Sequence, residues 1–172
     1  MSRSTTKAAL VAALVAALKP GLQAALPKLQ DGACYPRAQK APYTAAIPAF
    51  MVSEMDQILE PLAGIRIYDN ENTPSQYQIM LLVARASGGS SATPEQEAAR
   101  FDRAMADREA AVEAIKVALI GVFATSPGIA ELRSVTERSD PRGNVLDEDF
   151  AEYLGSIVEI DVRERPYFPG GG

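Results

Sequence analysis

The chain has 172 residues, 47% of them apolar and 23% charged, which suits one domain with its own core and is too short for two. Its net charge is −5 and no lysine- and arginine-rich run occurs, which disfavours tight nucleic-acid binding. With no histidine and a single cysteine, Cys34, the composition excludes Ser-His-Asp catalysis, histidine-ligated metals and an intramolecular disulfide.

The first predicted element is an alanine-rich helix over about 5–18. Its leucines recur every four residues and share one face: Leu10, Leu14 and Leu18. The expected N-cap is a hydroxyl residue: Ser4, Thr5 or Thr6. Pro20 and Gly21 predict a break, with a short helical continuation over about 22–26.

The apolar run 8–18 also resembles a signal peptide, because Arg3 and Lys7 precede it. The run is too short to span a bilayer, and no small-x-small cleavage site follows directly. We therefore interpret it as a packed helix that stays in the mature protein, and expect no membrane partner.

A Pro-rich loop is predicted over about 31–48. A loop this long inside a compact domain is typical of a functional or interaction segment. It contains Cys34, which we interpret as a buried or half-buried thiol, because no histidine is present to activate it as a nucleophile.

Strands are predicted over about 49–55, at "GIRIYD" and at "QYQIMLLVARA", with a turn of helix after the first. The last of these is apolar on both faces, as in a central strand covered on both sides by a helix or a neighbouring subunit. Its two faces carry Tyr77, Ile79, Leu81 and Val83 on one side and Met80 and Leu82 on the other.

The longest predicted helix runs over roughly 94–124 and stops before Pro127. Thr93 and Gln96 form a capping box, and Pro94 suits the first helical position. Apolar residues recur at helical spacing along it: Phe101, Met105, Val112, Ile115, Leu119 and Val122. The loop before this helix is rich in glycine and serine and is expected to be flexible over 88–92.

Two strands close the chain, over about 132–138 and 154–165, and are expected to pair antiparallel. The excursion "VLDEDFAEY" between them is predicted to be polar. In the second strand Val158, Ile160 and Val162 face the core. Its open face carries charges that either contact a neighbouring subunit or are merely solvated: Glu159, Asp161, Arg163 and Arg165.

These elements predict an α+β fold, a mostly antiparallel sheet with an N-terminal helix and one long helix packed against it. We expect a single domain over 1–172, with the Pro-rich loop at about 31–48 and a flexible Gly tail at 169–172.

Candidate chemistry is sparse. The acids of "DEDF" at 147–150 favour a solvated turn over a cation site, because the remaining ligand positions of a calcium loop are missing. Asp69, Glu71, Glu54 and Asp56 are conceivable catalytic carboxylates, but nothing in the sequence brings them together. No glycine-rich phosphate-binding motif occurs, and we expect no cofactor, metal or catalytic residue.

The order of the elements resembles the tail terminator (tail completion) proteins of tailed bacteriophages. The matching segments are "TTKAALVAALVAAL", the Pro-rich segment, "QYQIMLLVARA", the helix "EQEAARFDRAMADREAAVEAIKVALIGVFA", "ELRSVTERS" and "YLGSIVEIDVRERPYF". The resemblance covers most of the chain and lies in pattern, since this family has no catalytic signature.

The resemblance implies a structural virion protein of the tail–neck junction that is assembled in the host cytoplasm. It implies a ring of copies of the chain, usually a hexamer, that caps the tail tube protein and meets a head-side connector or neck protein. DNA would pass through the lumen without specific binding. The alternatives are a head–tail adaptor or stopper, which would contain little strand, and a small enzyme that uses carboxylates or Cys34.

Overall fold

The computed structural model describes residues 3–36, 47–55, 74–86, 91–125 and 130–164. Their helices and strands are, in chain order, α1 (Arg3–Ala25), β1 (Cys34–Tyr35), β2 (Ala49–Glu54), β3 (Pro74–Arg85), α2 (Pro94–Thr125), β4 (Ala130–Arg138) and β5 (Tyr153–Glu164). The strands form one five-stranded sheet in the order β1-β2-β3-β5-β4, antiparallel except for the β1–β2 pair. The predicted α+β class is confirmed.

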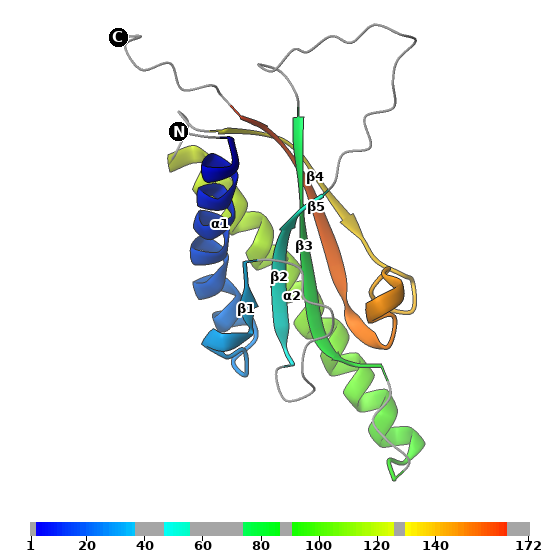
Figure 1. Cartoon of the computed structure of the whole chain (residues 1–172). Helices are drawn as coiled ribbons and strands as arrows, with labels where there is room; N and C mark the ends of the chain where they lie inside the picture. Colours follow the sequence, from blue (N-terminus) through cyan, green and yellow to red (C-terminus); the bar gives the residue numbers. More distant parts are fainter. Residues whose placement is uncertain (1–2, 37–46, 56–73, 87–90, 126–129, 165–172) are drawn as a thin grey trace, which may run out of the picture.

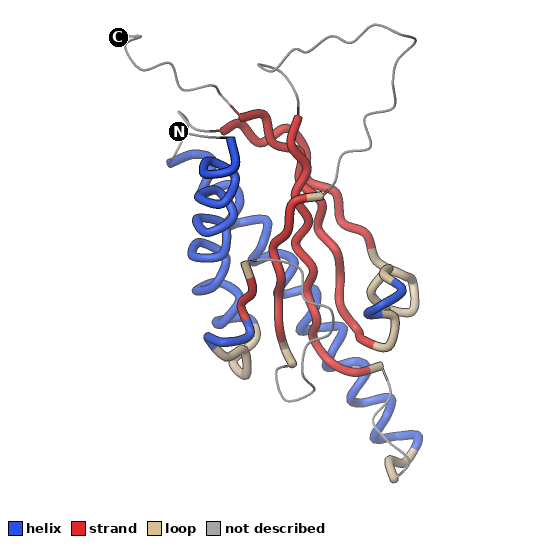
Figure 2. Tube along the Cα trace, in the orientation of Figure 1, coloured by secondary structure: helices blue, strands red, loops and turns tan. Residues whose placement is uncertain are grey.

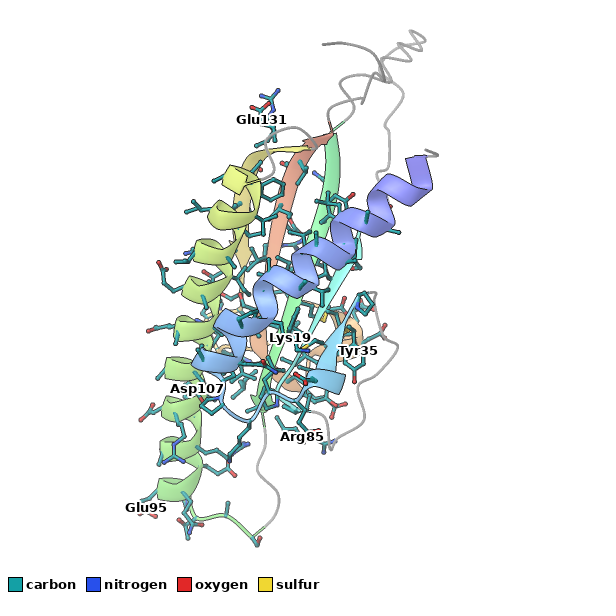
Figure 3. The ribbon with its side chains drawn as sticks, turned by 90° about the vertical axis from the view of Figure 1, so that its left-hand side faces the viewer. Lys19, Tyr35, Arg85, Glu95, Asp107 and Glu131 are labelled. Carbon is teal, nitrogen blue, oxygen red and sulfur yellow. The ribbon has the colours of Figure 1, made fainter. Side chains whose placement is uncertain are left out.

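The molecule has a helical layer on one face of the sheet (Figure 2). α1 and α2 cross over this face, as the rotated view in Figure 3 shows. A Cβ added at Gly21 would lie 3.6 Å from the Cβ of Ala114, so the two backbones approach closely there. The main core lies between this layer and the sheet.

α1 continues through the predicted break at Pro20. The proline removes one helical hydrogen bond and costs roughly 3 kcal/mol in a helix interior. Leu22 and Leu26 extend the buried leucine stripe beyond it, and each fully buried leucine contributes about 1.5–3 kcal/mol. Pro20 itself is exposed, on the side of the helix away from the core. The prediction of two helical pieces was therefore wrong, because tertiary burial outweighs the local cost.

The start of α1 was also misplaced. The helix begins at Arg3 and so includes the hydroxyl residues expected to cap it. The prediction that Leu10, Leu14 and Leu18 share the packed face is confirmed, since all three are buried.

β3 is a central strand buried on both faces, as predicted. Tyr77, Ile79 and Leu81 belong to the core beneath the helices. Met80 and Leu82 belong to a second, smaller core on the opposite face. The cover on that second face comes from the chain itself, because Val145 and Phe150 of the β4–β5 connection pack there. The connection predicted to be polar therefore carries two buried anchors.

β5 lies between β3 and β4 and pairs antiparallel with both, which confirms the predicted pairing with β4. Val158, Ile160 and Val162 are fully buried in the main core, also as predicted. β5 therefore holds the sheet together, because it pairs with a strand along each of its two edges and packs its inner face in the main core.

α2 begins as its capping box predicts. The Thr93 backbone N–H donates to Gln96 Oε1 at 3.0 Å, and the Gln96 N–H donates to Thr93 Oγ1 at 3.2 Å. Val112, Ile115 and Leu119 are buried as expected. Phe101 is exposed instead, so the predicted stripe was wrong at this position.

Part of the Pro-rich loop is ordered structure. A short 3-10 segment over Asp31–Ala33 leads into β1, which pairs with Phe50 and Met51 of β2.

Other predictions lie outside the described residues: the loop over 37–46, the helical turn and strand within 56–73, the flexible loop at 88–90 and the Gly tail.

Candidate interaction surfaces

Cys34 lies in β1 and is half-buried, as the sequence predicted. Its thiol donates to the Gln30 carbonyl at 3.6 Å. Desolvation by burial raises the pKa of the Cys34 thiol, although nearby Lys19 opposes this. A raised pKa reduces the thiolate fraction at neutral pH, and the thiolate is the nucleophilic form. This position is consistent with a packing role.

A polar cluster close to Cys34 ties the end of α1 to the 3-10 segment. Lys19 Nζ lies 3.0 Å from Asp31 Oδ1, and Gln23 Nε2 donates to the same oxygen at 2.7 Å. These two contacts, Lys19 first, lower the pKa of the Asp31 carboxyl. Each of the three side chains contacts another member of the cluster, which indicates that the cluster stabilises the connection between α1 and the 3-10 segment.

The acidic turn at 147–150 is a capped 3-10 segment. The Asp149 N–H donates to Asp147 Oδ1 at 2.9 Å, and Phe150 anchors the turn in the second core. Within the described residues no group of three or more acids, cysteines or histidines is placed to hold a metal ion. Of the four conceivable catalytic carboxylates, Glu54 is exposed at the end of β2. The other three, Asp56, Asp69 and Glu71, lie outside the described residues.

The open face of β5 is polar, and its acids are already engaged within the subunit. Glu159 Oε1 accepts from Arg138 Nη1 at 2.7 Å, and Asp161 Oδ2 accepts from Ser134 Oγ at 2.7 Å. Both donors come from the adjacent strand, β4. The Arg163 side chain and the whole of Arg165 lie outside the described residues. The role of the four charged residues at a subunit contact therefore stays a prediction.

A different surface is apolar and uncovered. Val117 and Ile120 on α2 are 63% and 66% exposed, whereas large apolar side chains are usually buried. α2 has no charged residue from Val117 to its end, and α1 has none from Ala8 to Leu18. We call the exposed residues Val117, Ile120, Gly121 and Ala124 the α2 apolar surface.

The sequence interpretation missed this surface, although a signal for it was present. Val117 and Ile120 lie outside the predicted apolar stripe of the helix, in a segment that has lost the charges found at exposed positions nearer the N-terminus of α2. Apolar residues outside the buried stripe of a helix mark a second apolar face. Exposed apolar surfaces of this kind mark interaction sites more often than isolated apolar residues do.

One helix in the described part of the chain, over Ala8–Ala25, is long and apolar enough to cross a membrane by length and composition alone. Its leucines at positions 10, 14, 18 and 22 are buried in the main core. The helix therefore packs along one leucine face, and its exposed positions are mostly alanine, which together account for its apolar composition.

The fold and its surfaces define an α+β protein whose described polar clusters stabilise its own connections, and whose two most exposed large apolar side chains, Val117 and Ile120, lie near the end of α2. No protein-family model matches the chain, and no curated protein matches it. Its function therefore has to be argued from the molecule itself.

Proposed function

We propose that this protein is a structural component of a bacteriophage virion at the tail–neck junction. Copies of the chain would form a ring that caps the tail tube and joins it to the head-side connector, with DNA passing through the lumen. The support comes from the order of the elements and from the α+β fold that this order predicts. The net charge of −5 suits a channel that must not retain DNA.

The observation that carries the proposal is the α2 apolar surface. Val117 and Ile120 each expose more than half of their area, whereas Val112, Ile115 and Leu119 of the same helix are buried in the core. Contact with another protein surface would bury these side chains and gain roughly 1–2 kcal/mol for each. Assembly is therefore a better explanation of this surface than catalysis is.

A ring also needs two different surfaces on each subunit, because its contacts are head-to-tail. The helical layer offers an apolar surface, and the opposite face of the sheet offers the polar outer side of β5.

The rival functions are less well supported. An adaptor or stopper would be dominated by helix, whereas this chain has a five-stranded sheet. An enzyme using Cys34 would need an activated thiol, and burial raises the pKa of this one. Turnover on a broad substrate panel that is lost on replacing Cys34 or Glu54 would favour the enzyme.

The test of the proposal is the mass of the purified protein by native mass spectrometry, followed by negative-stain imaging. We expect a closed ring, and a ring that binds the end of a purified tail tube. A protein that stays monomeric at all concentrations and does not bind tubes would refute the proposal.

The first prediction concerns the α2 apolar surface. Replacing Val117 and Ile120 with glutamate should abolish ring assembly and leave the melting temperature of the single subunit within about 2 °C, because both positions are exposed in the subunit. The matched control is Ala110→Glu, which adds a charge at an exposed position in the charged part of the same helix. Normal assembly of the double variant would exclude this surface from the contact.

The second prediction concerns the charged end of β5. Replacing Arg163 and Arg165 with glutamate should weaken assembly without unfolding the subunit, if these arginines meet acids of a neighbour. One exposed pair contributes only about 0–1 kcal/mol, but a ring repeats the contact in every subunit. The measurement is ring formation against ionic strength, and unchanged assembly would mean that these charges are merely solvated.

A further inference from the structure

β4 forms one edge of the sheet. It pairs with β5 on one side, and no strand in the described part of the chain pairs with its other side. In Figure 1 the strand starts near the top of α1 and its arrow ends on the other side of the sheet from α1. Its side chains over 133–138 are all exposed, Val135 among them at 37%. This edge strand has nine residues with a bulge at Arg133, and an edge strand is a template for another strand unless its side chains or bulges prevent pairing.

The residues around Val135 are complementary to themselves. They read Arg133, Ser134, Val135, Thr136, Glu137: base, hydroxyl, apolar, hydroxyl, acid. In an antiparallel pair of two copies centred on Val135, each Arg133 lies opposite a Glu137. Ser134 then lies opposite Thr136, and the two valines lie opposite each other. Opposite charges, hydroxyl pairs and β-branched pairs are the cross-strand pairs that stabilise a sheet.

Other registers lack this match. Sliding one strand by two residues places Glu131 opposite Glu137 in one direction, and Val135 opposite Glu137 in the other. Sliding by four residues places Arg133 opposite itself or Glu137 opposite itself. A shift by one residue brings side chains of opposite sheet faces together. Charges usually protect an edge from pairing, but here one register pairs opposite charges, and the shifted registers either bring like charges together or lose the charge pairs.

Both charged residues have capacity for a partner across the edge. Arg133 is the extra residue of a β-bulge, because the register with β5 shifts between Leu132 and Ser134, so the regular alternation of β4 extends over Ser134 to Arg138. Its Nε lies 4.0 Å from Glu131 Oε1, and both side chains are about half exposed. Glu137 Oε1 accepts from Ser156 Oγ at 3.1 Å. A guanidinium has five N–H donors and a carboxylate has two oxygens, so these contacts do not exhaust either group.

We propose that β4 is a self-association site, at which two copies of this chain join edge to edge through antiparallel β4 strands centred on Val135. The contact is two-fold, so the same residues act on both copies and the two sheets become continuous. It does not rest on the proposed ring, whose contacts are head-to-tail. It would pair two free subunits, or two rings, equally well.

The experiment is a charge-swap cycle followed by sedimentation equilibrium. Arg133→Glu and Glu137→Arg each place like charges opposite each other twice, and each should weaken association by about tenfold or more. The combined Arg133→Glu/Glu137→Arg variant restores both pairs and should associate like the original chain. Circular dichroism melting of each variant checks that the subunit remains folded. If the combined variant associates no better than the single ones, the proposal is wrong.

Cross-linking provides an independent measurement on a variant that removes no charge. In a Cys34→Ala background, Val135→Cys places two thiols opposite each other, at a Cα separation of about 4.5–5.5 Å, which a disulfide spans. The matched control is Leu146→Cys, since Leu146 is more exposed, at 44%, and lies outside β4. We expect rapid disulfide dimers from the Val135→Cys variant only. Equal cross-linking of both variants, or of neither, would overturn the proposal.

The two proposals fail separately. If rings form and the β4 contact is correct, Glu137→Arg should halve the assembled mass, whereas replacing Ile120 with glutamate should dissolve the ring itself. If no ring forms, the β4 contact still predicts a dimer that Glu137→Arg converts to a monomer. A mass that Glu137→Arg leaves unchanged contradicts the β4 contact alone.

Discussion

Replacing Ile160 with aspartate is expected to unfold the subunit at neutral pH. Ile160 is fully buried in the main core, and its register neighbours are Tyr77 on β3 and Val135 on β4. A carboxylate there would be charged without a partner. The loss of transfer energy and the burial of the charge together cost roughly 5 kcal/mol or more, which is comparable with the whole stability of a typical domain.

The pH dependence identifies the charge as the cause. Burial raises the pKa of an introduced aspartate above its unfolded value of about 3.9. The penalty is therefore full above the raised pKa and decreases as the pH falls towards the unfolded value. Urea unfolding between pH 7 and pH 5 should show the Ile160→Asp variant regaining stability relative to the original protein.

The control is Ile160→Asn, which has a similar shape and no charge. This variant should also be destabilised, but its loss of unfolding free energy relative to the original chain should not depend on pH. An Ile160→Asp variant that unfolds at nearly the original urea concentration would mean that this part of the core is hydrated.

Replacing Gly155 with alanine should lower the stability by roughly 3 kcal/mol, although it adds one methyl group. Gly155 lies in β5 opposite Leu82, at the point where the register with β3 is irregular. A Cβ there would lie 1.9 Å from the Leu81 carbonyl oxygen and 3.0 Å from Val145 Cγ2. The oxygen belongs to the backbone, so the strand itself would have to move.

Gly121 provides a control of opposite sign. It is exposed in α2, and a Cβ there would meet nothing within 4 Å. Gly121→Ala should therefore stabilise the helix by about 0.5–1 kcal/mol. In thermal unfolding of the single subunit, Gly155→Ala should melt about 6–12 °C lower and Gly121→Ala a few degrees higher. A Gly155→Ala variant that melts like the original would contradict the close approach of β5 to β3.

Local signals in the sequence determined the type of most described elements. The capping box at Thr93 placed the start of α2, because its hydrogen bonds join residues three apart in the chain. The alternation of Val158, Ile160 and Val162 identified β5 and its inner face, because a strand has a period of two wherever it lies. The fold class followed from the order of these elements.

The candidate surfaces were less predictable. The sequence placed charges on the open face of β5, but it did not reveal that Glu159 and Asp161 find donors on β4. Those contacts depend on register across twenty or more residues of chain. The α2 apolar surface was visible only as residues outside the predicted stripe, and their exposure was measurable only after α2 had packed.

The sequence by itself therefore determined the periods of the helices and strands, the capping box of α2 and the fold class. The periods and the cap arise between near neighbours along the chain, and the fold class follows from the order of the elements. Tertiary structure decided three other features. It inserted β5 between β3 and β4, it carried α1 through Pro20, and it covered the second face of β3 with Val145 and Phe150. Each depends on contacts between segments distant in sequence, where burial of apolar surface outweighs local preference.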